Sequence, residues 1–316
     1  MINISFNKNL FRKHIEKIEK SIKKQIQIIL KTNLSKEDKK CIEYIKKELT
    51  NILSADDKKL QSIIKKFEKN YPDSIGKSNQ KKENWKTLYK IIREDIFERE
   101  YNNWSERKTY GAYTFVNELD LKTCPYCNRN YIFIVDEKTG KLRPEIDHFY
   151  PKSIYPFLAM SFYNLIPSCP TCNHTKKDKN SLIKKLKNPY GINSDYYQFS
   201  INPNNIDFAN IGNKYDYDNF DISINKKDSN IEIFKLEELY KQHKDIVVDL
   251  IIKKVHYPKS YINELINFGF NEDEIYRYLL CNYSDKTDLN KRPLSKLVKD
   301  ISQELKLLEK IRNEYE

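Results

Sequence analysis

The chain has 316 residues, 39% of them hydrophobic, so it has room for one domain with extensions or for two loosely joined domains. With only 6 Gly and 11 Pro, long regular elements are favoured over a turn-rich β architecture, and helix should dominate. The formal net charge of +12 suits a polyanionic partner, although 45 acidic residues are interspersed among the basic ones. No secretory signal and no apolar run long enough to cross a membrane is visible, so we expect a soluble, cytoplasmic protein without membrane contacts.

Amphipathic helical patterns fill the N-terminal third of the chain. Apolar residues recur at spacings of three and four over 7–31, and Ser35 and Ser54, each followed three residues later by Asp, resemble capping boxes that open two further helices. Residues 71–83 lose this period and gain Pro, Gly and Ser, which indicates a linker, and residues 85–104 are helical again. Three interpretations are open for these helices, namely a DNA-gripping arm, a partner-docking bundle and a solvated helical scaffold, and their ordinary Lys-rich faces favour the scaffold.

The C-terminal part alternates between short β-prone runs and helices. Residues 189–235 are rich in aromatic residues and Asn, with short alternating runs of which 231–234 is the last, and they predict a small accessory β region. The helical period resumes over 236–316, where Asn271, followed three residues later by Glu, predicts a capping box. The final helix is expected to run through 294–311.

Two C-x-x-C pairs stand in the middle of the chain, Cys124 with Cys127 and Cys169 with Cys172. A redox role is the competing interpretation, but two such pairs with Pro after the first Cys of each favour a metal site. Tetrahedral zinc needs four ligands at one point, and each C-x-x-C turn places two thiolates side by side. We therefore predict one structural Zn²⁺ on these four cysteines, with no open coordination position for chemistry.

Between the two pairs, the sequence predicts a two-stranded ribbon followed by a helix. Residues 131–135 and 142–146 are β-prone, a Gly-containing turn separates them, and the second strand ends at Asp147 and His148. Residues 173–187 predict a helix. The shared zinc would pack the ribbon against this helix and bring their polar residues together.

These polar residues suit the hydrolysis of a phosphodiester, which needs a base to deprotonate water and a cation to neutralise charge on the phosphate. His148 is the candidate base. Asp147 offers a hard carboxylate oxygen to Mg²⁺ or Mn²⁺, and Asn173 offers a second oxygen. His174 directly follows Asn173 and is an alternative ligand or a phosphate contact.

Basic residues near this segment are candidates for contacts with phosphate, chiefly Arg129, Lys152 and Lys176. Contacts of this kind position a nucleic acid without reading its sequence. Lys176 is the strongest candidate, because it lies about one helical turn from Asn173 and would point along the same face.

The segment from Cys124 to Lys179 resembles the HNH endonucleases of the zinc-containing ββα-metal type. Their pattern is C-x-x-C, D-H-x-x-P-K-S, N-L and C-x-x-C-N-x-x-K, and this chain has C-P-Y-C, D-H-F-Y-P-K-S, N-L and C-P-T-C-N-H-T-K. The resemblance implies that His148 is the general base, that Asp147 and Asn173 hold the catalytic divalent ion, and that Asn164 orients the loop carrying the base. The last position of the pattern is His in many members.

The spacing is also similar to that of bacterial anti-phage HNH proteins of the Septu type, which are encoded beside an AAA/ABC-like ATPase. Two further segments also resemble that wider group, L-Y-K-Q-H-K-D at 239–245 and K-R-P-L-S-K-L at 291–297. This resemblance implies an AAA/ABC-like ATPase subunit as a partner. The nucleic acid expected is DNA, with RNA left open as an alternative.

The fold class expected is therefore α+β and predominantly helical, with a zinc-stapled ββα-metal core between helical regions. Four consecutive regions are predicted: an N-terminal helical region (1–104), the nuclease core (105–188), the accessory β region (189–235) and a C-terminal helical region (236–316).

The leading hypothesis for function is a metal-dependent DNA endonuclease. The second is a non-catalytic, zinc-stapled module that binds nucleic acid, in which Asp147 and His148 bond to each other structurally. The third is an effector subunit that stays silent until an ATPase engages its helical arms.

Overall fold

The computed structural model describes residues 1–77, 80–135, 142–203 and 220–307, which are mostly helical, in agreement with the composition. Contacts divide the chain into two compact units. The N-terminal unit comprises Asn3–Leu121 and Ile132–Ile192, and the C-terminal unit comprises Met1–Ile2, Lys122–Tyr131 and Asn193–Glu316. Each unit thus combines segments that are distant in the sequence, and the division into four consecutive regions stays a prediction.

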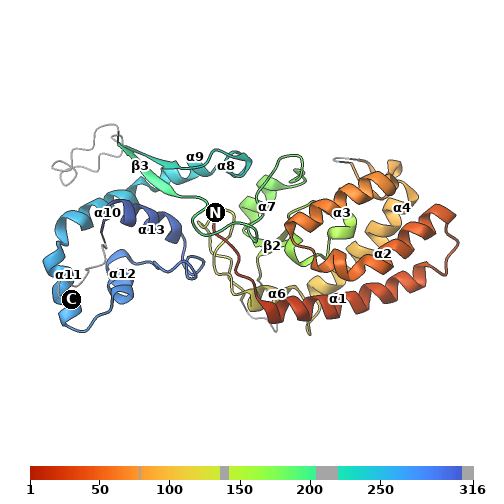
Figure 1. Cartoon of the computed structure of the whole chain (residues 1–316), viewed down its shortest axis with the longest axis horizontal. Coiled ribbons are helices and arrows are strands. Elements are labelled where there is room, and N and C mark those ends of the chain that lie inside the picture. The colour runs from red at the N-terminus through yellow and green to blue at the C-terminus, as the bar shows by residue number, and fades with distance from the viewer. Residues whose placement is uncertain (78–79, 136–141, 204–219, 308–316) are drawn as a thin grey trace. The chain divides into compact units, whose positions relative to one another are not determined.

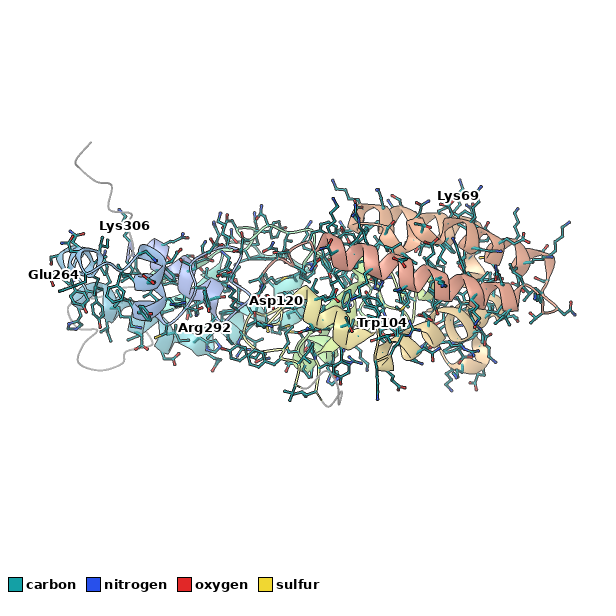
Figure 2. The ribbon with its side chains drawn as sticks, turned by 90° about the horizontal axis from the view of Figure 1, so that it is seen from below. Lys69, Trp104, Asp120, Glu264, Arg292 and Lys306 are labelled. Atoms are coloured by element: carbon teal, nitrogen blue, oxygen red, sulfur yellow. The ribbon has the colours of Figure 1, made fainter. Side chains whose placement is uncertain are left out.

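Three long helices open the N-terminal unit: α1 (Lys8–Ile29), α2 (Lys36–Ser54) and α3 (Asp57–Asn70), with α1 packed beside α2 (Figure 1). Their apolar stripes are buried, while lysines such as Lys69 point into solvent (Figure 2). The side chain of Ser35 accepts a hydrogen bond from the backbone of α2, as its sequence predicts. The cap of α3 is Asp56 and not Ser54.

The helical stretch predicted over 85–104 is confirmed, but it contains a π-helical turn. The helix α4 (Thr87–Lys90) continues through η3 (Ile91–Phe97), which is π-helical, into α5 (Glu98–Glu106). π-helical turns insert an extra residue into a helix and occur frequently at functional sites. The short helix α6 (Ala112–Leu119) follows.

A buried histidine ties α1 to the rest of the N-terminal unit. His14 Nε2 lies 2.8 Å from the carbonyl oxygen of Met160, and His14 Nδ1 lies 2.9 Å from the hydroxyl of Tyr110. Burial lowers the pKa of His14 to about 4, so the ring is neutral at pH 7. A carbonyl only accepts, so Nε2 donates and Nδ1 accepts from Tyr110. The ring also packs edge-on against Trp104, a fully buried side chain labelled in Figure 2.

The strand that ends at the Asp-His pair, β1 (Glu145–His148), pairs antiparallel with β2 (Leu165–Ser168). The predicted ribbon is therefore wrong in its pairing, although Val135 and Leu142 do form an isolated antiparallel bridge. Every residue of β2 is buried, so burial of this apolar strand decides the pairing over proximity in sequence. The predicted turn over 136–141 lies outside the described residues.

The helix α7 (Pro170–Lys176) packs against β1 and is shorter than the predicted 173–187. It stops because Lys177 adopts φ 48° and ψ −134°, a backbone conformation incompatible with a right-handed helix and unusual for a residue other than glycine. Two 3₁₀ turns, η4 (Pro156–Leu158) and η5 (Phe162–Asn164), connect β1 to β2.

The C-terminal unit contains an antiparallel pair, β3 (Phe199–Pro203) with β4 (Phe220–Ile224), as the sequence leads us to expect. The helix α8 (Ser229–Phe234) replaces the strand predicted at 231–234, because Asp228 caps its first backbone N–H groups. The remaining helical elements follow in order: α9 (Leu236–Tyr240), η6 (Lys241–His243), α10 (Lys244–His256), α11 (Lys259–Asn267), α12 (Glu272–Leu280) and α13 (Ser295–Glu304).

The helix α13 packs on β3 (Figure 1). The carboxylate of Asp300 accepts a hydrogen bond from the backbone N–H of Phe199 in that strand. The capping box predicted at Asn271 is present. The predicted last helix, 294–311, begins as α13 does but ends early, at Glu304, because residues 305–307 form a turn in which Lys306 has φ 52°. Residues from 308 onward lie outside the described part of the chain. Among the described helices, none combines the length and the apolar character that a membrane crossing requires.

Candidate metal centre and active-site cleft

The four predicted zinc ligands come together. The sulfur atoms of Cys124, Cys127, Cys169 and Cys172 all lie within 4.8 Å of one another, and the four side chains are buried. Tetrahedral zinc with bonds of about 2.3 Å needs sulfur atoms about 3.8 Å apart, so the cluster can close on one ion with small adjustments. Soft thiolates in a tetrahedral set favour Zn²⁺, and they leave no position for substrate.

Local backbone geometry explains how the first C-x-x-C pair is formed. The backbone N–H of Asn128 donates to the carbonyl of Cys124 at 2.7 Å, and Asn128 itself adopts a left-handed conformation with φ 50°. The backbone N–H of Arg129 then donates to Cys127 Sγ at 3.4 Å, which stabilises a thiolate there. In the second pair, Cys169 is the N-cap of α7 and Cys172 lies in its first turn.

A cleft of about 320 Å³ lies in the N-terminal unit, at the end of β1. Its walls come from α5, β1, the turn after β1, and α7 with the turn that follows it. The lining residues are Tyr101, Ile146, Asp147, His148, Pro151, Lys152, Asn173, His174, Lys177 and Asp178. The cleft therefore brings together three of the four residues predicted to be catalytic, Asp147, His148 and Asn173.

The His148 ring is held by a backbone carbonyl. Its Nε2 lies 3.0 Å from the carbonyl oxygen of Ala159, and because a carbonyl only accepts, Nε2 carries the proton. In the neutral ring, Nδ1 is then the nitrogen with the lone pair. Burial holds the pKa of His148 well below its usual value, Lys152 and Lys176 act in the same direction, and the Ala159 carbonyl opposes them. The imidazole is therefore neutral at pH 7.

Asp147 and Lys176 form a buried ion pair. Lys176 Nζ lies 3.0 Å from each oxygen of the Asp147 carboxylate, and it also donates to the carbonyl oxygen of His148 at 2.9 Å. The side chain of Lys176 is 0% exposed and that of Asp147 is 4% exposed. The expectation that Lys176 faces phosphate is therefore wrong for this structure. Its ammonium instead connects α7 to the end of β1.

Asn173 is oriented by a glutamate from β1. Asn173 Nδ2 donates to Glu145 Oε2 at 2.8 Å, which leaves Asn173 Oδ1 as the atom available to a metal ion. His174 Nε2 lies 3.5 Å from the other oxygen of Glu145, and its side chain is 75% exposed. Both Asn173 and His174 line the cleft, so the geometry leaves the choice between them open.

Asn164 does not line the cleft but fixes the segment that follows His148. Its Oδ1 accepts from the backbone N–H of Tyr150 at 2.6 Å, and its Nδ2 donates to the carbonyls of Tyr150 and Leu158 at 3.1 and 2.9 Å. The side chain is fully buried, so removal of the amide would leave several polar groups unsatisfied.

The other two predicted phosphate contacts differ in their surroundings. Lys152 lines the cleft, is half-buried, and lies 3.1 Å from Glu98 Oε1. Arg129 belongs to the C-terminal unit and donates from Nε to His243 Nε2 at 2.9 Å. Arg129 is not among the residues that line the cleft. Lys152 is thus the predicted cation with direct access to a ligand bound there.

Sequence reasoning missed Glu145 and Tyr101. Glu145 lies two residues before Asp147, so strand alternation places both side chains on one face, and that signal could have identified it. Tyr101 belongs to α5, far from the motif in sequence, and no local pattern marks it.

We predict that the purified chain holds about one zinc per molecule and that Cys172→Ser lowers this content to near zero, because a three-thiolate site binds zinc far more weakly. Metal content by mass spectrometry of the intact metalloprotein measures the change. Cys281→Ser is the matched control, since Cys281 is exposed and lies outside the cluster. Equal zinc content in the two variants would contradict the assignment.

Lys176→Met should reduce the free energy of unfolding by about 3 kcal/mol, because it leaves the buried Asp147 carboxylate without its cation. Urea denaturation followed by tryptophan fluorescence measures this change. Lys184→Met, at an exposed position, should change the stability by less than about 0.5 kcal/mol. A similar small effect for both variants would show that the ion pair is not formed in solution.

Comparison with known proteins gives one informative match. The chain is 35% identical over 72 residues to the Septu protein PtuB of Bacillus thuringiensis. The match covers 23% of this chain and 26% of that protein, so the chain matches about a quarter of the relative's length. No family model matches the sequence, and no solved structure matches it significantly. The chain is therefore similar to a Septu protein over a limited segment.

Proposed function

We propose that the chain is a metal-dependent HNH-type endonuclease that hydrolyses DNA phosphodiester bonds in the cleft at the end of β1. The observation that carries the proposal is the convergence of Asp147, His148 and Asn173 on one cleft, with the ring of His148 fixed by Ala159 and the amide of Asn173 fixed by Glu145. Preorganised groups of this kind are what catalysis of hydrolysis requires.

In this mechanism His148 acts as the general base. Its neutral ring accepts a proton from a water molecule at Nδ1 while Nε2 stays bonded to Ala159. The water oxygen attacks phosphorus, the bond to the 3′ oxygen breaks, and that oxygen leaves with a proton from solvent. The products carry a 5′ phosphate and a 3′ hydroxyl.

The donor set fits a hard divalent ion. Asp147 presents a carboxylate at the wall of the cleft, and Asn173 presents Oδ1. Oxygen ligands of this type suit Mg²⁺ or Mn²⁺. When bound, such an ion supplies charge neutralisation at the scissile phosphate and at the departing oxygen. His174 is the alternative ligand, and comparison of Asn173→Ala with His174→Ala in metal titrations separates the two.

Contacts with the DNA backbone are assigned to Lys152 and Lys177, both of which line the cleft. Lys177 is exposed, and the strained backbone conformation at this residue ends α7. Lys177 thus takes the role that the sequence suggests for Lys176. Such contacts raise affinity and make it dependent on salt.

The similarity to a Septu protein supports a role for this nuclease as an effector in anti-phage defence, together with an AAA/ABC-like ATPase. A second candidate function, a non-catalytic module that binds nucleic acid, is favoured by one observation. Lys176 neutralises the charge of Asp147, which weakens the attraction of that carboxylate for a cation. Binding of DNA without cleavage under any divalent ion would select this alternative.

The proposed nuclease should nick or linearise plasmid DNA in the presence of Mg²⁺ or Mn²⁺, and His148→Ala should lower the rate by about 100-fold or more. Gel analysis of plasmid cleavage by the two proteins, purified in parallel, measures the effect. His256→Ala serves as the control, because His256 is exposed and lies outside the cleft. Full activity of His148→Ala would reject the mechanism.

Lys177→Gly should raise stability and weaken DNA binding at the same time. Glycine adopts the backbone conformation of Lys177 without strain, which should add about 1 kcal/mol to the free energy of unfolding. Loss of the ammonium should weaken duplex binding several-fold at low salt. Thermal melts and fluorescence anisotropy measure the two effects.

Lys185→Gly is the matched control, because Lys185 is also exposed and has φ 53° but does not line the cleft. It should stabilise the chain or leave it unchanged, with duplex affinity retained. Equal loss of affinity in both glycine variants would mean that Lys177 has no special place in binding.

A further inference from the structure

The aromatic ring of Tyr101 lies against both the candidate base and the candidate phosphate-binding lysine. Its ring centroid lies 4.7 Å from that of His148, with the two planes tilted by 59°. Lys152 Nζ lies 4.5 Å from the same ring centroid. Tyr101 also lines the cleft, although it comes from α5 and not from the motif segment. The ring therefore contacts two groups assigned to catalysis and substrate binding.

The helix that carries Tyr101 is anchored on both sides of it. Trp104, three residues later, is fully buried, and its ring lies 6.0 Å from that of Tyr101. Glu98, three residues earlier, accepts from Arg93 Nε at 3.1 Å and pairs with Lys152. Burial alone would raise the pKa of Glu98, but Lys152 and Arg93 hold it below its usual value, so the carboxylate is charged. These contacts fix Tyr101 relative to the cleft.

The hydroxyl of Tyr101 is suited to donate to a ligand. Within residues 1–77, 80–135, 142–203 and 220–307, no hydrogen bond involves this hydroxyl, and it is not one of the buried polar atoms that lack a partner. Its oxygen therefore reaches solvent. Burial of the ring raises the pKa of Tyr101, so the phenol keeps its proton at neutral pH. A protonated phenol beside Lys152 offers a donor where an anionic oxygen would be stabilised.

We propose that Tyr101 is a further catalytic residue, whose hydroxyl donates a hydrogen bond to a non-bridging oxygen of the phosphodiester bound in the cleft. This proposal rests on the proposed nuclease function. The ring packs against His148 and supports Lys152, while the hydroxyl contacts the reacting phosphate. Hydrogen bonds to a charged partner are stronger than those between neutral groups, and they strengthen further as charge develops on the phosphoryl oxygens.

The test compares Tyr101→Phe, which removes only the hydroxyl, with Tyr101→Leu, which also removes the aromatic ring. Tyr278→Phe is the control, since Tyr278 is an exposed tyrosine outside the cleft. Cleavage of plasmid DNA is measured under single-turnover conditions with Mn²⁺, together with thermal stability and the affinity for a DNA duplex without added divalent ion. Tyr101→Phe should slow cleavage by about 10- to 100-fold. Its melting temperature and duplex affinity should match those of the control.

Three results would overturn the proposal, and they are distinguishable. If the unmodified chain and Tyr101→Phe cleave at the same rate, the hydroxyl makes no contact and the nuclease function stands. If Tyr101→Leu alone is slow, the ring only supports its neighbours. If the unmodified chain cleaves no DNA with any divalent ion, the proposed function itself fails, and the catalytic role of Tyr101 fails with it.

Discussion

The buried ion pair between Lys176 and Asp147 is the constraint on which the candidate site depends. A charge buried in a protein interior must be paired, so the ammonium at the end of α7 and the carboxylate at the end of β1 require each other. The same ammonium donates to the carbonyl of His148, which fixes the backbone of the candidate base. One side chain thus sets the distance between the helix that carries Asn173 and the strand that carries Asp147.

The helices of the N-terminal unit are part of this construction. The segment between β1 and β2 is hydrogen-bonded to all three long helices. The carbonyl of Met160 contacts His14 on α1, and the hydroxyl of Ser161 donates to the carbonyl of Ile52 on α2 at 2.7 Å. The hydroxyl of Tyr150 donates to Asp57 at the start of α3 at 2.7 Å. Together with Tyr101 on α5, these contacts mean that the motif segment does not build its cleft alone. The scaffold interpretation of these helices therefore has a concrete physical basis.

The sequence predicted correctly those features that depend on residues close together in the chain. The two C-x-x-C pairs predicted a group able to hold a metal, because this spacing itself brings two thiolates together. The capping box at Asn271 could be predicted in the same way, because it depends only on two residues three positions apart. The partner of β1 and the position of Lys176 could not be predicted, since both are decided by burial against residues far away in the chain. Helical spacing gave the face of Lys176 relative to Asn173, but it could not show that Asp147 lies there.

Two reactive side chains of the candidate site, His148 and Asn173, each have one nitrogen hydrogen-bonded to the protein and one atom left for chemistry. Nε2 of His148 donates to the carbonyl of Ala159, and Nδ2 of Asn173 donates to the carboxylate of Glu145. In each case the hydrogen bond that orients the group also determines which atom can act, because the donor atom is occupied and the acceptor atom remains. Fixed donors reduce the reorganisation needed when substrate binds, which is how such sites lower reaction barriers. Ala159 orients His148 through its backbone carbonyl, and Glu145 orients Asn173 from its position on the strand that packs against α7. A substitution that keeps the motif residues but displaces either partner should therefore misorient His148 or Asn173.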